Sequence, residues 1–345
     1  MAKSQLPIPA HFDADTVGDI WRVPYQERAA AAREYARQHA VAPAAADRAR
    51  VALLLVDVQN TFCAPGFELY VGGASGTAAV DDNRRLCRFL YRNLNRITDI
   101  CLSLDTHQAM QIFHPVFLVD DEGRHPDPYS LITHEDIAAG RWRFNPEVAS
   151  PLGIDPEDGQ AHLAHYAAAL KQGGKYELTV WPYHAMFGGI GHAVVSAVEE
   201  AVFFHTIARY SRPDFQIKGH QPLTEHYSIL QPEVSRTRQG VELGRINTAF
   251  QDKLLSYDAV IIAGQAKSHC VSWTVSDLLT AIGRTDSRLA GKFYLLDDCS
   301  SPVVIPEVVD YSQQARSAYR SFADAGMHVV RSSDPVADWP DFPIE

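Results

Sequence analysis

The stretch Asp258-Ala-Val-Ile-Ile-Ala-Gly-Gln-Ala-Lys-Ser-His-Cys270-Val decides the fold of this chain. Its apolar run over residues 259–263 ends in glycine, which predicts a strand buried inside a parallel sheet and a turn after it. Helical spacing follows over residues 271–282. Cys270 is therefore expected at the N-terminus of a helix, beyond the carboxyl end of a strand.

Cys270 is a candidate nucleophile because of that position. The partial positive charge at a helix N-terminus stabilises a thiolate, and open α/β sheets place their sites at the carboxyl ends of their strands. A packing role is the simplest alternative, since free cysteines are among the most buried residues. A redox-sensing thiol is another, although no resolving cysteine lies nearby in the sequence.

The same apolar pattern recurs along the chain in alternation with helical spacing. Strands are expected over residues 51–56, 97–104, 215–217, 259–263, 293–296 and 328–330. Helices are expected over residues 25–39, 80–95, 160–171, 192–208, 245–255, 271–282 and 308–325. Strands that alternate with helices predict an α/β fold, with three αβα layers around a six-stranded parallel sheet.

Two segments depart from this alternation. Residues 1–49 form an Ala/Arg-rich N-terminal extension whose helix over 25–39 ends before Pro43. Residues 50–345 form the main domain, which an insertion at about 116–178, rich in Pro, Asp, Gly and His, interrupts. Long loops of this kind are usually functional or disordered, so we expect the insertion to serve as a lid or an oligomer contact.

Composition excludes several classes of protein. The chain has 345 residues, of which 46% are hydrophobic, and a net charge of −11 without a basic cluster, which argues against nucleic acid and anionic membranes as partners. No run of about 18 apolar residues predicts a membrane-spanning helix, and residues 1–10 lack a signal pattern. The five cysteines fit neither a zinc ribbon nor a disulfide framework. A reducing cytoplasm is the expected location.

Charged residues stand at the ends of two further strands. Asp57 follows the first strand and is a candidate general base for a thiol, or else a cap of the following turn. Lys218 follows the third strand, where burial would penalise its charge unless it is paired. We expect it to pair with Asp57 beside Cys270; the alternative is a lysine whose ammonium reaches solvent.

A possible metal site follows the second strand. In Asp105-Thr-His107, alternate residues of an extended segment point the same way, so a carboxylate and an imidazole can face one cation. His184, in Trp181-Pro-Tyr-His184, offers a second imidazole. This donor set suits Zn²⁺, Fe²⁺ or Mn²⁺, with positions left open for water or substrate. The alternative is a set of unrelated polar groups on loops.

Five ordered motifs, spread from about residue 51 to residue 330, together resemble those of the isochorismatase-like cysteine hydrolase superfamily, and within it the nicotinamidases. The motifs are Asp57-Val-Gln-Asn-Thr-Phe62, Asp105-Thr-His107, Trp181-Pro-Tyr-His184, Lys218-Gly with Glu225-His-Tyr-Ser228, and Ala266-Lys-Ser-His-Cys270-Val. The resemblance implies a hydrolase acting on the carbon–nitrogen bond of linear amides, a bound divalent metal (Zn, Fe or Mn) and a homo-oligomer.

The resemblance also implies roles around the nucleophile. Cys270 would attack the carbonyl of a small amide such as nicotinamide and form a thioester. Asp57 would carry the thiol proton to the leaving ammonia, and Lys218 would hold both charges in place. The backbone N–H groups of Ala266 and Cys270 would form an oxyanion hole. The peptide bond Gln265–Ala266 would be cis.

The remaining implied roles concern the metal and the substrate. The metal would bind the pyridine nitrogen of nicotinamide, or a water in its place, and its ligands would be Asp105, His107 and His184. Phe62 and Trp181 would enclose the ring, although core packing is an equal alternative for both. Gln265 would line the substrate site.

The chain departs from the family's pattern at several positions. The nucleophile turn has Lys267 and Ser268 where the family favours Thr and Asp, and Gln265 replaces a small apolar residue. His114 comes one residue later than a further histidine ligand of some members. The residues for amide hydrolysis stay in place, while the substrate stays open. The alternatives are hydrolysis of another bond, such as a ureido amide or a vinyl ether, and a non-catalytic binding protein on the same fold.

Overall fold

A six-stranded parallel sheet forms the centre of the fold. The computed structural model describes residues 5–343, so the first four residues and the last two lie outside the described chain. The strand order is β12-β9-β8-β1-β2-β7, and the strands pair in parallel. They are β1 (Val51–Val56), β2 (Asp99–Asp105), β7 (Asp214–Lys218), β8 (Ala259–Gly264), β9 (Phe293–Leu296) and β12 (His328–Val330). The predicted α/β class and six strands are confirmed.

The two central strands, β1 and β8, are the ones that the apolar runs of the sequence predicted most directly. Every residue of β1 and of β8 is buried, as expected for strands covered on both faces. The strands align from Val51 opposite Ala259 to Val56 opposite Gly264. Gly264 has a φ of +119°, and a Cβ there would lie 2.1 Å from the carbonyl oxygen of Val56. Only glycine therefore lets β8 end against β1 and turn into the segment that carries Cys270.

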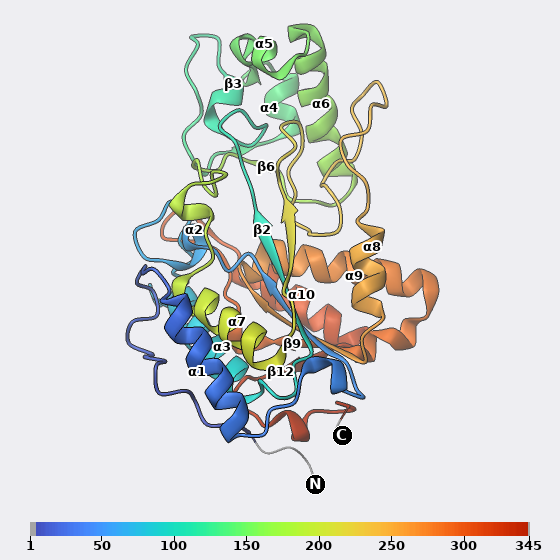
Figure 1. Ribbon diagram of the computed structural model, residues 1–345. Coiled ribbons are helices and arrows are strands. Elements are labelled where there is room, and N and C mark those ends of the chain that lie inside the picture. The colour runs from blue at the N-terminus through green and yellow to red at the C-terminus, as the bar shows by residue number, and fades with distance from the viewer. Residues whose placement is uncertain (1–4, 344–345) are drawn as a thin grey trace. The chain divides into compact units, whose positions relative to one another are not determined.

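Helices cover both faces of this sheet (Figure 1). The connections β1-α3-β2 and β2-α7-β7 run in one direction across the sheet, and β8-α9-β9 and β9-α10-β12 run in the other. Because such crossovers are right-handed, α3 and α7 cover one face and α9 and α10 the other. The helices here are α1 (Tyr25–Gln38), α2 (Asn60–Cys63), α3 (Ala78–Arg92), α7 (Ser196–Arg209), α8 (Thr248–Leu255), α9 (Ser272–Thr285) and α10 (Ser312–Asp324).

Several predicted helices begin later in the structure; those expected over 192–208 and 245–255 start at Ser196 and Thr248. A hairpin of β10 (Val304–Ile305) and β11 (Val309–Asp310) occupies the start of the helix expected over 308–325, so α10 begins only at Ser312. A π-helical turn, Lys267–Val271, precedes α9. Cys270 lies in that turn, one residue further from the regular helix than the spacing predicted.

The chain separates into two compact units. Unit 1 comprises residues 1–104, 193–216 and 248–345, and unit 2 comprises residues 105–192 and 217–247. Unit 2 contains the segment predicted as an insertion; that insertion's boundaries, and those of the N-terminal extension, stay predictions. Its elements are β3 (Leu118–Val119), β4 (Leu131–Ile132), α4 (His134–Ala138), β5 (Arg143–Phe144), α5 (Ala149–Leu152), α6 (Pro156–Gln172) and β6 (Leu178–Thr179).

Sequence reasoning found only one element of unit 2 between residues 116 and 178. The helix expected over 160–171 is α6, which begins earlier, at Pro156, because the Asp155 side chain accepts a hydrogen bond from the backbone N–H of Glu157. The strands of the pairs β3–β5 and β4–β6 have two residues each. Periodicity cannot reveal strands of that length.

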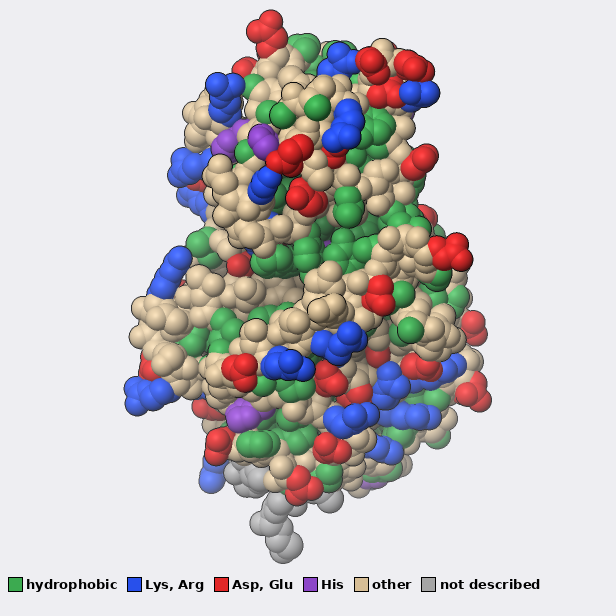
Figure 2. All heavy atoms as spheres, turned by 180° about the vertical axis from the view of Figure 1, so that it is seen from behind, with side chains coloured by type: hydrophobic (Ala, Val, Ile, Leu, Met, Phe, Trp, Pro, Cys, Tyr) green, Lys and Arg blue, Asp and Glu red, His purple; other side chains and the backbone are tan. Residues whose placement is uncertain are grey.

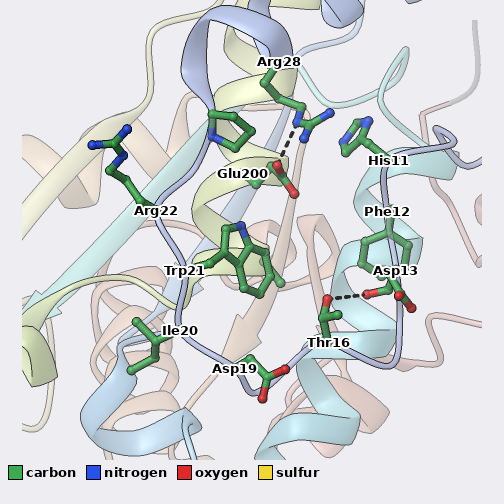
Figure 3. A pocket seen from close by; sticks show the side chains of 12 residues that line it. His11, Phe12, Asp13, Thr16, Asp19, Ile20, Trp21, Arg22, Arg28 and Glu200 are labelled. Atoms are coloured by element: carbon green, nitrogen blue, oxygen red, sulfur yellow. Dashed lines mark hydrogen bonds and ion pairs between the residues drawn. The ribbon is translucent and has the colours of Figure 1, made fainter.

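The N-terminal segment packs on α7 within unit 1 (Figure 3). The backbone of Trp21 holds the Ser196 hydroxyl, with a 2.9 Å bond from its N–H and a 3.0 Å bond to its carbonyl. Arg28 of α1 donates to the Glu200 carboxylate at 2.7 Å. Beside these contacts lies an open pocket of about 600 Å³ whose wall includes Phe12. The predicted helix of the extension is confirmed as α1.

The described surface and helices bear on possible partners. On the face in Figure 2, Lys and Arg side chains are interspersed with Asp and Glu. Within residues 5–343, no helix has the length and apolar character needed to cross a membrane.

Candidate active site and metal site

The nucleophile turn follows β8 in unit 1. Cys270 is 7% exposed and lies in the π-helical turn, Lys267–Val271, that precedes α9. The peptide bond Gln265–Ala266 is cis, as the resemblance implied. The side-chain amide of Gln265 is buried, where its Nε2 donates to Asp82 at 2.8 Å and its Oε1 accepts from the backbone N–H of Ser301 at 3.2 Å. These bonds anchor the start of the turn; a substrate contact for Gln265 stays a prediction, as does an oxyanion hole at Ala266 and Cys270.

Asp57 follows β1, the strand next to β8. Its backbone has a φ of +47°, which turns the chain sharply after the strand. The side chain is fully buried. The Ser103 hydroxyl of β2 donates to Asp57 Oδ1 at 2.5 Å and accepts from the Asp57 N–H at 3.1 Å. This double contact orients the carboxylate, and Ser103 is a residue that sequence reasoning missed, although it stands two positions before Asp105 on the same strand.

Unit 2 brings together Asp105, His107 and His184 in one buried cluster. One potential ligand atom from each lies within 4.8 Å of the others. His107 Nε2 is 2.7 Å from Asp105 Oδ2, and His184 Nε2 is 3.6 Å from the same oxygen. The carboxylate and imidazole of Asp105-Thr-His107 and the imidazole of His184 therefore converge on one point, as the sequence motifs suggested.

The outer hydrogen bonds of the histidines suit a metal. His107 Nδ1 is 3.1 Å from the carbonyl oxygen of Gly219, and His184 Nδ1 is 2.8 Å from that of Pro182. A carbonyl only accepts, so each Nδ1 carries a hydrogen and each Nε2 is directed at the Asp105 carboxylate. Hydrogen bonds of this kind, on the ring nitrogen that faces away from the ion, orient metal-binding histidines. The donor set therefore fits a divalent ion such as Zn²⁺, Fe²⁺ or Mn²⁺.

The electrostatics of the cluster also suit a cation. Burial, the largest single influence, raises the pKa of Asp105, but the attraction of His107 and Lys218 and the hydrogen bonds of His107 and His184 together outweigh it, so this pKa lies well below its ordinary value. Burial lowers the pKa of His107, yet the attraction and the hydrogen bond of the Asp105 carboxylate together outweigh it and raise the net value, so a metal would displace a proton from this imidazole. An ionised carboxylate in a buried site attracts positive charge strongly, because little water screens it.

His114 lies beside the cluster without joining it. Its ring centroid is 5.9 Å from the centroids of both His107 and His184. Its Nδ1 is 3.1 Å from the carbonyl oxygen of Ala109. Burial, followed by the two neighbouring histidines, lowers its pKa to about 3. A ligand role for His114 stays open.

Lys218 is the last residue of β7 and is 3% exposed. Its Nζ donates to Asp105 Oδ1 and to the carbonyl of His226, both at 2.8 Å. The expected pairing of Lys218 with Asp57 stays a prediction. The alternative of a solvent-directed ammonium is wrong, because the side chain is buried in an ion pair.

Gly219 supports the cluster and was not singled out by the sequence. It has a φ of +86°, and a Cβ there would lie 2.7 Å from both Asp105 Oδ1 and His107 Cε1. Its carbonyl accepts from His107 and from Gln111 Nε2, the latter at 2.6 Å. The Lys218-Gly motif therefore places a glycine at a position where any side chain would displace Asp105 and His107.

The aromatic residues predicted for the substrate are both buried. Phe62 lies in α2, and Trp181 donates from Nε1 to the Tyr227 hydroxyl at 3.1 Å. Their enclosure of a ring stays a prediction. Glu225 is a further buried acid of unit 2, and burial raises its pKa to about 7 despite the opposing pull of His107. In the sequence, Glu225 was noted only as part of the motif Glu225-His-Tyr-Ser228.

Comparison with solved structures relates this fold to nicotinamidases. The yeast nicotinamidase bound to the inhibitor nicotinaldehyde is 16% identical, covers 81% of this chain and 99% of its own, and superposes with a TM-score of 0.51. A nicotinamidase/pyrazinamidase of Acinetobacter baumanii is 16% identical, covers 84% of this chain and 99% of its own, and has a TM-score of 0.49. A Pyrococcus horikoshii pyrazinamidase in complex with zinc is 16% identical, covers 82% of this chain and 99% of its own, and has a TM-score of 0.43.

The likeness to the yeast enzyme shows that the chain shares the fold of this nicotinamidase. No model of a protein family matches the sequence, and no curated protein matches it.

Proposed function

We propose that the protein is a cysteine amidohydrolase that releases ammonia from nicotinamide or a related small amide through a thioester, with a divalent metal bound. The observation that carries the proposal is the buried cluster of Asp105, His107 and His184, whose histidines are held by backbone carbonyls in a way that suits a metal. It occurs in a fold that the yeast nicotinamidase shares, in a chain that retains a cysteine at the N-terminus of a helix.

The proposed chemistry begins at the thiol. Asp57 takes the proton of Cys270, and the sulfur attacks the amide carbonyl carbon. The negative charge that develops on the carbonyl oxygen is stabilised by the backbone N–H groups of Ala266 and Cys270, an effect worth about 3 kcal/mol per donor. Asp57 then returns the proton to the nitrogen as ammonia leaves. Lys218 balances the charge of the carboxylates during these steps.

A second half-reaction restores the enzyme. Asp57 accepts a proton from water, and the resulting hydroxide attacks the thioester carbonyl. The carbon–sulfur bond breaks, the carboxylic acid leaves, and Cys270 recovers its proton. Every proton that Asp57 takes up is thus returned within one turnover.

The metal would have a binding role. Asp105, His107 and His184 would hold it, and it would supply a Lewis-acid position for the ring nitrogen of the substrate or for a water. Phe62 and Trp181 would pack against the ring. Because the ring nitrogen is remote from the scissile bond, a hold on it would fix the orientation of the amide.

Turnover by a matched pair of cysteine variants tests the proposal. Ammonia release is measured with nicotinamide, pyrazinamide, benzamide, an aliphatic amide and a ureido amide, before and after treatment with a chelator and return of Zn²⁺, Fe²⁺ or Mn²⁺. Cys270→Ala should lose at least about 10⁴-fold in kcat, as removal of a nucleophile does. Cys87→Ala, which alters a buried thiol on α3, should retain turnover. Full activity of Cys270→Ala would end the proposal.

The choice of substrate is a separate question for the same assay. The buried amide of Gln265 stands where the family has a small apolar residue, so the pocket can favour a ureido amide or another bond. Turnover of such a compound, lost in Cys270→Ala, would keep the mechanism and change the substrate. Absence of turnover with metal bound would favour a binding protein.

Two further expectations belong to the proposal. The cysteines at 63, 87, 101, 270 and 299, all among the described residues, form no disulfide, which agrees with the reducing cytoplasm that we propose as the location. A homo-oligomer is proposed from the family resemblance, and light scattering after size-exclusion chromatography tests it.

A further inference from the structure

The nucleophile turn carries a lysine that the proposed chemistry does not use. Lys267 stands three residues before Cys270, at a position where the family favours threonine. Its Nζ donates to Asp297 Oδ1 at 2.5 Å and to the Asp297 carbonyl at 3.0 Å. The same nitrogen lies 4.3 Å from the centroid of the Tyr319 ring. The side chain is 12% exposed, so this cation is built into the fold rather than displayed on its surface.

Lys267 forms part of a small cavity of unit 1, here called the Lys267 pocket. The pocket has a volume of about 300 Å³, and its wall includes Lys267, Asp297, Arg316, Tyr319 and Arg320. It lies between the nucleophile turn, the segment after β9 and helix α10. A volume of this size suits a small molecule.

The charges of the pocket are unbalanced. The wall of the pocket holds three cations, Lys267, Arg316 and Arg320, and one carboxylate, Asp297, which already pairs with Lys267. Outside the wall, the exposed carboxylate of Asp310 also interacts with Arg316. Arg316 and Arg320 are exposed and stand four residues apart on α10. Like charges at that spacing repel each other across one helical turn. The wall of the pocket therefore carries two guanidinium groups whose charge its single carboxylate does not offset.

We propose that the Lys267 pocket binds a small anion through a carboxylate or phosphate group. The guanidinium groups of Arg316 and Arg320 would grip its oxygens, because the planar fork of arginine matches both groups in geometry. The anion would relieve the repulsion along α10. Its remaining oxygens would compete with Asp297 for the ammonium of Lys267.

A ligand here would act on the nucleophile turn through its backbone. The N–H of Lys267 donates to the carbonyl of Ser301 at 2.8 Å, and its carbonyl accepts from the Ser272 hydroxyl at 2.5 Å. The residue thus joins the segment after β9 to the first residue of α9. Binding in the pocket is a property of unit 1 that does not depend on the proposed amidase activity.

Calorimetric titration of the full chain, without substrate, tests the site. Inorganic phosphate and benzoate are the two probes, at one fixed ionic strength, and they distinguish a phosphate from a carboxylate ligand. The wild-type protein should bind at least one of them. The double variant R316Q/R320Q should bind it about tenfold more weakly or worse, since two charge-assisted contacts are lost.

A matched pair of arginines controls for net charge. Arg88 on α3 and Arg284 on α9 are also exposed helical arginines of unit 1, so R88Q/R284Q removes the same charge elsewhere and should keep the affinity within about twofold. R316K/R320K keeps the charge without the forks and should lie between wild type and R316Q/R320Q. Circular dichroism checks folding, and if the glutamine variant does not fold, the lysine variant decides.

Three results would overturn the proposal. The first is the failure of the wild-type protein to bind either probe. The second is an equal loss in R88Q/R284Q, which would indicate attraction to net charge alone. The third is an unchanged affinity in R316K/R320K and R316Q/R320Q alike. Because no step of the titration uses turnover, an inactive protein would still give a clear answer.

Discussion

Substitution of Gly219 by alanine is the sharpest test of the metal site. The residue has a φ of +86°, and its new Cβ would lie 2.7 Å from Asp105 Oδ1 and from His107 Cε1. Neither neighbour can move freely, because Lys218 holds the same Asp105 oxygen at 2.8 Å and the Gly219 carbonyl itself holds His107. The carboxylate and the imidazole must therefore shift together, which spoils the convergence of the ligand atoms.

Two magnitudes follow from this geometry. An L-residue in a left-handed conformation costs about 1–2 kcal/mol in unfolding free energy. Displacement of supporting groups around a metal typically lowers its affinity by about 10–100-fold. Gly188→Ala separates the two effects, since Gly188 has a φ of +78° with nothing within 4 Å of a new Cβ, and it follows His184 by four residues.

The assay is competition for Zn²⁺ against a chromophoric chelator, with thermal unfolding measured with and without the ion. Both variants should lose about 1–2 kcal/mol of unfolding free energy in the absence of metal. Only Gly219→Ala should lose metal affinity, by about 10–100-fold. Equal affinities in the two variants would show that the cluster of Asp105, His107 and His184 is not where the ion binds.

Three further predictions concern stability. Burial lowers the pKa of His205 from 6.5 to about 4, while its Nε2 bonds the Ile97 carbonyl at 2.9 Å. Because the unfolded chain binds more protons than the folded chain below pH 6.5, the unfolding free energy should fall by about 3 kcal/mol as the pH drops to 4. Urea titrations of His205→Gln should show a weaker dependence of the unfolding free energy on pH between 6.5 and 4. Gly264→Ala should leave no soluble folded protein, because its Cβ would meet the backbone of β1. Gly326→Ala, the control, has a φ of +100° but a nearest atom at 3.7 Å from the new Cβ, and it should fold. Soluble yield and circular dichroism measure whether each variant folds. Thr133 caps α4 through a reciprocal bond with Asp136, so Thr133→Ala should reduce unfolding free energy by about 1 kcal/mol in urea titrations and Thr133→Ser should not.

The central sheet was readable from the sequence because its strands are buried on both faces. An uninterrupted apolar run such as residues 259–263 leaves little choice of structure. The hairpin within residues 304–310 was missed, and its second strand fell inside the helix expected over 308–325, since its strands have only two residues each. Such short pairs depend on tertiary contacts rather than on local pattern.

The site residues were located by motif, but their partners were not. Strand order decides the neighbours of Lys218, because β7 lies next to β2, the strand that ends in Asp105. The bonds from Ser103 to Asp57 and from His107 to the Gly219 carbonyl depend on register and on a left-handed turn. No spacing rule contains that information, although the residue types at the strand ends do predict which chemistry gathers there.

The order of the strands has a consequence for synthesis of the chain. β1 pairs with β2 and with β8, and β8 follows β1 by about 200 residues, a separation that slows folding. Until the ribosome has released β8, one edge of β1 stays unpaired while its apolar side chains lack part of their cover. The arrangement that sets Asp57 beside the strand of the nucleophile therefore also makes the nascent chain dependent on protection from aggregation.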